Sequence, residues 1–155
     1  MRRQKSIRRG DLVFIYPKTW CERIIANYDG KYCHVGIALS PQHLLSMKFR
    51  GVCIDNLDEC YKGRIIDVCE VTTTQEKKEE MIKFLISLMP VGRYDFRALL
   101  SFIWHLIPQD PGRFICSEYI CLGLFYIGLD PEALTLSPLQ LANQPFVEYV
   151  TTIEV

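Results

Sequence analysis

The stretch "HVGIALSPQHLLSM", residues 34–47, has the pattern of two short strands joined by a tight turn. Its first half is apolar at most positions, and Pro41 with Gln42 then turns the chain into a second apolar run. Two strands joined by so short a turn pair antiparallel, because a parallel pair needs a much longer crossover. The rest of the predicted fold is built outward from this hairpin.

Further strands are expected on both sides of the hairpin. The segments are "GDLVFIYP" (10–17), "GVCI" (51–54) and "RIIDVCEV" (64–71), and "FVEYVTTIEV" (146–155) is a final edge strand or a tail. Short turns join most of the first five strands, so an antiparallel meander is the natural arrangement. A short helix over 19–29, ending near Gly30, stands between the first strand and the hairpin.

The second half of the chain is predicted to be helical. Thr73 and Glu76 form a capping box for a helix that stops at Pro90. Three more helices are expected: "DFRALLSFIWHLI" (95–107), "CSEYICLGLFYI" (116–127) with Gly128 as its C′ residue, and a short helix over 138–143 with Ser137 as N-cap. Segregation of strands and helices predicts an α+β fold.

The chain has the length of one domain, residues 1–155. Within it we expect a basic N-terminal tail (1–9), a mainly β part (10–71), a mainly α part (72–128), and a short helix with a tail (129–155). The net charge is zero, so no basic field suggests nucleic acid. Five of the first nine residues are basic, which predicts a solvated tail or, alternatively, contact with a lipid or phosphate surface.

The cysteine content indicates a reducing compartment. The seven cysteines are an odd number without a CxxC pair, and neither a signal peptide nor a transmembrane span is recognised. A cytoplasmic protein with reduced thiols is therefore expected. Because the Cys and His spacing matches no zinc pattern, we expect no metal and no cofactor.

Cys116 is the candidate nucleophile, because it lies where an apolar run becomes a helix. Backbone N–H groups and the dipole at a helix N-terminus favour a thiolate and could face an oxyanion. The alternative is a small buried core residue. Among the three histidines, His34 opens a strand and is the best candidate base, while His43 is expected in solvent and His105 in a helix.

Five motifs together resemble a known family. "GDLVFIY", "HVGIAL" and "RGVCIDNL" are similar to the second half of an NlpC-type papain-like domain, and "GRYDF" with "FICSE" to its first half. The two halves stand in reversed order here. The chain thus resembles the circularly permuted papain-like proteins, the YiiX-like group and the related lecithin:retinol acyltransferase-like proteins, over residues 8–128.

The resemblance implies a role for each matching residue. Cys116 matches the nucleophile, His34 the general base, and Tyr94 with Ser117 the substrate or oxyanion positions. The third position, twelve residues after His34, holds Ser46, where relatives usually have Glu, His, Asn or Gln. A serine accepts a hydrogen bond from imidazole but does not offset its charge. The fallback orienters are Glu70 and, less well aimed, Glu118.

The implied function is a cysteine-dependent hydrolase of the amidase or peptidase type, which acts through a thioester at Cys116. One alternative is an acyltransferase or phospholipase of the lecithin:retinol acyltransferase type, and another is a catalytically weak acyl- or peptide-binding module. The expected substrate is a small molecule, a peptide or a lipid conjugate. The bond type and the oligomeric state stay open. A redox pair of Cys116 and Cys121 is disfavoured, since the two lie on different helix faces.

Overall fold

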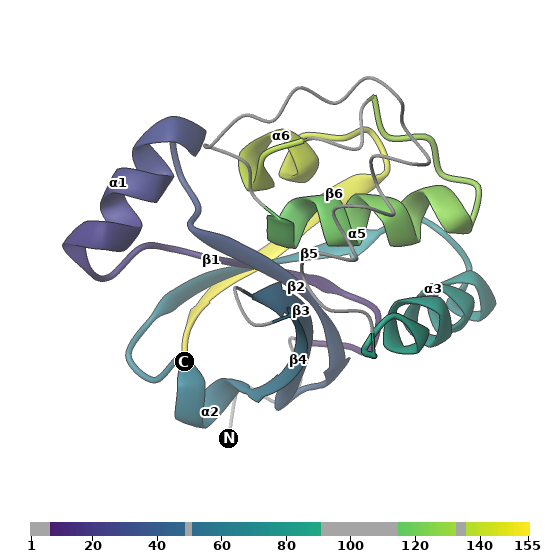
Figure 1. Ribbon diagram of the computed structural model, residues 1–155, viewed down its shortest axis with the longest axis horizontal. Coiled ribbons are helices and arrows are strands. Elements are labelled where there is room, and N and C mark those ends of the chain that lie inside the picture. Colours follow the sequence, from purple (N-terminus) through teal and green to yellow (C-terminus); the bar gives the residue numbers. More distant parts are fainter. Residues whose placement is uncertain (1–6, 49–50, 91–114, 133–135) are drawn as a thin grey trace.

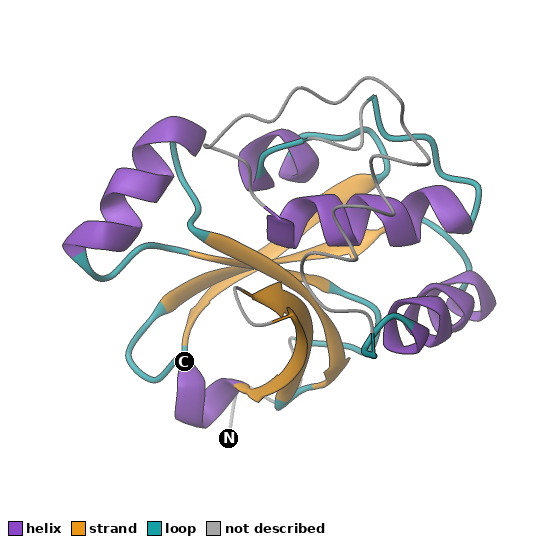
Figure 2. Cartoon of the chain, viewed as in Figure 1, coloured by secondary structure: helices purple, strands orange, loops and turns teal. Residues whose placement is uncertain are grey.

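The computed structural model describes residues 7–48, 51–90, 115–132 and 136–155. The expected helix over 95–107, including His105, lies outside these residues, as does Tyr94. The described chain is an α+β protein with one six-stranded antiparallel sheet packed against helices, which confirms the predicted class at this level (Figures 1 and 2).

All strand pairs are antiparallel, and the order across the sheet is β4-β3-β2-β1-β5-β6. The strands are β1 (Leu12–Ile15), β2 (His34–Ser40), β3 (His43–Lys48), β4 (Gly51–Asn56), β5 (Ile65–Val71) and β6 (Val147–Glu154). The first four form the expected meander. The fifth does not extend it but returns to the other side of β1.

The helices follow the sequence signals closely. They are α1 (Trp20–Asp29), α2 (Leu57–Cys60), α3 (Gln75–Ser87), α5 (Ile115–Tyr126) and α6 (Pro138–Ala142). As predicted, α1 ends at Gly30, whose φ is 94°, and α6 begins after Ser137 with Pro138 in its first turn. Gly128, with φ 84°, follows the end of α5.

Two local predictions need correction. The N-cap of α3 is Thr74 rather than Thr73, because the helix begins one residue later and the Thr74 side chain accepts from the Lys77 N–H. The N3 residue of the helix is then Lys77 and not Glu76, so the predicted capping box does not form. The short α2 was not predicted, although Asn56 caps it through the backbone N–H groups of Asp58 and Glu59.

The sheet is covered on both faces. Along β1, Leu12 and Phe14 pack into the core under the helices, while Val13 and Ile15 pack into a second core on the other face. Helix α5 lies on β2 and β3 between α3 and α6, and α2 closes the opposite side (Figure 1). Because α5 is buried nearly all round, its sequence is apolar on every face.

The described helices are all too short or too polar to cross a bilayer. β6 pairs with β5 alone and forms one edge of the sheet, so the final segment is a strand rather than a tail.

Candidate active site

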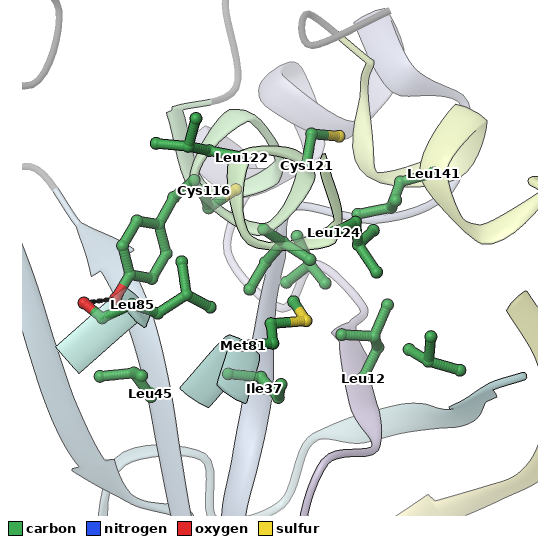
Figure 3. Packing of buried hydrophobic residues seen from close by; sticks show 14 of the residues in the cluster. Leu12, Ile37, Leu45, Met81, Leu85, Cys116, Cys121, Leu122, Leu124 and Leu141 are labelled. Atoms are coloured by element: carbon green, nitrogen blue, oxygen red, sulfur yellow. Dashed lines mark hydrogen bonds between the residues drawn. The ribbon is translucent and has the colours of Figure 1, made fainter. Parts of the chain in front are cut away.

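Cys116 lies in the first turn of α5 and is almost completely buried. Figure 3 shows it together with Cys121, Leu122 and Leu124 of the same helix, in the core cluster that also contains Ile37 and Leu45. The backbone N–H groups of Val35, Ser117 and Cys116 itself act to lower the pKa of the Cys116 thiol. Helix α5, which carries Cys116, packs on β2 and β3.

His34 is the first residue of β2, directly before Val35, and is half-buried. Its Nε2 lies 3.0 Å from the Oγ of Ser46, which is fully buried in β3. The strand register explains this contact. Ile37 pairs with Leu45, which brings the side chain of His34 diagonally within reach of Ser46.

Strands β2 and β3 approach each other closely at Gly36, near the contact between His34 and Ser46. A Cβ on Gly36 would lie 2.7 Å from Leu44 Cγ and 2.8 Å from the Leu45 carbonyl oxygen. Only glycine fits at that distance without moving a neighbour. The regular β2–β3 pairing includes Ile37 and Leu45 but none of His34, Val35 or Gly36, so the Val35 N–H is not used in this ladder.

Three polar residues, Tyr61, Asp55 and Lys48, form a cluster next to the His34 ring. The Tyr61 ring stacks on it, with centroids 6.4 Å apart and planes 17° apart. The Tyr61 hydroxyl donates to Asp55 over 2.8 Å, and Lys48 pairs with the same carboxylate at 2.6 Å. Burial, followed by the nearby Lys48 ammonium, lowers the pKa of His34 to about 4. The imidazole is therefore neutral at physiological pH.

The electrostatics of Cys116 correct the expectation from its position. Burial raises the pKa of the thiol to about 12, although the three backbone N–H groups act in the opposite direction. In the described part of the chain, no hydrogen bond joins the Cys116 sulfur to the His34 ring. The Cys116 thiol and the His34 imidazole are both neutral at rest and lie on opposite faces of the sheet. Cys116 belongs to the core under α5, whereas His34 pairs with Ile15, which packs into the second core.

The remaining predicted residues lie apart from His34. Glu70 is in β5, with β1 between it and β2, and accepts a hydrogen bond from Lys78 over 3.0 Å. The Ser117 hydroxyl donates to the Leu136 carbonyl. Only the backbone N–H of Ser117, and not its side chain, acts on the pKa of Cys116. Glu118 is buried in α5. Of the orienters considered, Ser46 is the one in contact with His34.

Sequence reasoning missed three neighbours of the site. Cys53 pairs with Ser46 across β3 and β4, and its sulfur lies 3.9 Å from Ser46 Oγ. Tyr61 stacks on the His34 ring and donates a hydrogen bond to Asp55. Counting residues outward from the turn between β3 and β4 would have placed Cys53 opposite Ser46. No local sequence pattern marks Tyr61.

In the described ranges, no three His, Cys, Asp or Glu side chains come together in a way that could hold a metal ion. No family model and no curated protein matches the sequence.

Proposed function

We propose that the protein is a cysteine-dependent hydrolase of the amidase or peptidase type, with a circularly permuted papain-like fold. Cys116 is the nucleophile, His34 the general base, and Ser46 the residue that orients the base. One observation carries this assignment. The Ser46 hydroxyl contacts His34 Nε2 at 3.0 Å, and α5, which carries Cys116, packs on β2, the strand that begins at His34.

The protonation states define how the reaction begins. With Nε2 donating to Ser46, Nδ1 keeps a lone pair and is the basic nitrogen. Both the thiol and the imidazole are neutral at rest, and they lie on opposite faces of the sheet, so the mechanism requires the imidazole to reach the face of α5 when substrate binds. The Cys116 proton then moves to Nδ1 as sulfur attacks the acyl carbon. A stable thiolate–imidazolium pair before substrate binding is not part of this mechanism.

The proposed reaction has two steps. In the first, a carbon–sulfur bond forms, the bond to the leaving amine, alcohol or thiol breaks, and His34 returns the proton to the leaving group. In the second, His34 takes a proton from water, hydroxide displaces the Cys116 sulfur with release of a carboxylic acid, and His34 returns the proton to the sulfur. An acceptor alcohol or amine in place of water would give acyl transfer, as in the lecithin:retinol acyltransferase-type alternative.

The mechanism predicts an acyl adduct on Cys116. We expect incubation with a panel of acyl-amides, acyl-esters and phospholipids, followed by mass spectrometry, to find one substrate class that acylates this cysteine. Cys116→Ser should lose the thioester, whereas Cys121→Ser, a buried cysteine on the same helix, should keep it. Ser46→Ala should slow adduct formation by about tenfold, because an unoriented imidazole is a poorer base.

The second candidate is a binding module that keeps the fold without efficient catalysis. It is favoured by the neutral, buried thiol and by the lack of a hydrogen bond between sulfur and imidazole among the described residues. The two candidates differ in one result. If no substrate class acylates Cys116 and the wild type matches Cys116→Ser in turnover, the hydrolase assignment is wrong.

A further inference from the structure

Helix α1 exposes two large apolar side chains, which an ordinary surface helix would turn toward the core. Its inward face contains Ala26, which is buried, and the partly buried Glu22. Its outward face carries Trp20, 73% exposed, and Ile24, 48% exposed, at positions i and i+4. Two large apolar side chains one helical turn apart therefore point to solvent.

The inward glutamate is neutralised within the protein. Arg64 donates to both carboxylate oxygens of Glu22, at 2.7 and 2.9 Å, and holds the first turn of α1 against the start of β5. This ion pair and the backbone hydrogen bonds at the helix start lower the pKa of Glu22 to about 2, against the effect of burial. The outward face is thus left without the charge of this carboxylate.

Two exposed cations lie next to the pair in the chain, and a neighbouring turn carries a third cation and one more exposed apolar side chain. Lys18 and Arg23 flank Trp20 and are exposed, and neither forms an ion pair with a described carboxylate. The Lys18 ammonium lies over Gly63, where a Cβ would be 3.2 Å from its nitrogen. This contact joins α1 to the turn that bears exposed Lys62 and Ile65, the latter 50% exposed.

We propose that these six residues, the α1 patch, bind the surface of an anionic lipid bilayer. The patch consists of Trp20, Ile24, Ile65, Lys18, Arg23 and Lys62. Tryptophan prefers the interface between headgroups and acyl chains, and lysine and arginine around it attract anionic headgroups. Charge complementarity favours this occupant over an apolar protein surface, where three cations that pair with no described carboxylate would be desolvated. The inference does not depend on the proposed hydrolase activity.

The test uses the full chain and vesicles of phosphatidylcholine with or without phosphatidylserine. We expect flotation with the anionic vesicles, weakened by salt, and little with the neutral ones. Trp20→Ser combined with Ile24→Ser should lower the partition constant for binding to the anionic vesicles by about tenfold or more. Tyr149→Ser, which removes an exposed aromatic side chain from the edge strand β6, should leave binding unchanged.

A second measurement follows Trp20 directly. In a Trp104→Phe background, the emission of the remaining tryptophan should shift to the blue when anionic vesicles are added. The basic N-terminus is the competing site, so Arg2, Arg3 and Lys5 are changed together to Gln as a separate variant. If that variant loses binding and the Trp20→Ser, Ile24→Ser variant does not, the proposal is overturned. It is equally overturned if the wild type does not float, or if the α1 patch changes alter self-association alone.

Discussion

At the scale of single residues, His34 should make the stability of the protein depend on pH. Its pKa is about 4 when folded, against about 6.5 when unfolded, so the unfolded state binds more protons between these values. The free energy of unfolding should therefore fall as the pH drops below about 6.5, by about 2 kcal/mol between pH 7.5 and 5. Urea unfolding at the two pH values measures it.

His34→Gln is the matched variant, since an amide can still hydrogen bond Ser46 but does not titrate. The wild type should lose about 2 kcal/mol more than this variant between pH 7.5 and 5. Equal losses would mean that the folded protein tolerates a charged imidazole at this position. The assignment of a neutral His34 in the resting protein would then be wrong.

The candidate site shows what sequence can predict about a residue. The family resemblance placed Ser46 twelve residues after His34 as its partner, and the two side chains are in contact because the two strands are joined by a tight turn that fixes their register. The state of Cys116 was not predictable in the same way. A helix N-terminus is a local signal, whereas the burial that raises its pKa depends on how α5 packs on the sheet.

At the scale of elements, the contact between α3 and α5 depends on Gly123. A Cβ there would lie 2.9–3.0 Å from the Leu85 side chain. Alanine is the better helix former by about 1 kcal/mol, but this clash should reverse the sign, so that Gly123→Ala lowers the free energy of unfolding by about 1–2 kcal/mol. Thermal or urea unfolding of the variant gives the value.

A double-mutant cycle separates the clash from other causes. In a Leu85→Ala background the added methyl group enters free space, so Gly123→Ala should there be neutral or stabilising. The same cost in both backgrounds would show that Leu85 is not the reason for glycine at this position.

Local signals predicted most elements, but not how the sheet continues past β1. Caps and turn residues gave α1 and α6 at the expected places, because such signals lie within a few residues of the helix end. The return of β5 to the outer side of β1 has no local signal. It arises from pairing between strands that are fifty residues apart, which competes with a simple extension of the meander.

At the scale of the whole molecule, the seven thiols should react in order of their burial. Cys21 and Cys60 are exposed, Cys33 and Cys53 are half-buried, and the rest are buried: Cys69, Cys116 and Cys121. With iodoacetamide at neutral pH, we expect the first two to be modified in the native protein and the last three only after unfolding. Peptide mapping after timed quenching measures the order.

Early modification of Cys116 would contradict the burial of its sulfur at rest. Cys121 serves as the internal control, because burial raises its pKa to about 12 as well and both residues lie on α5. If the two label together at the rate of global unfolding, the site opens only with the whole fold. A slow thiol in this experiment is compatible with the proposed mechanism, in which the substrate induces proton transfer.

The second core has a consequence for the connectivity of the chain. Ile7 and Val155 belong to the same buried cluster on the face of the sheet opposite α5, so the two ends of the described chain lie close together (Figure 1). Joining them would close a ring with a short linker and little loss of entropy, and new ends could then be opened in an exposed turn elsewhere. We expect a chain reconnected in this way to keep the arrangement of strands and helices.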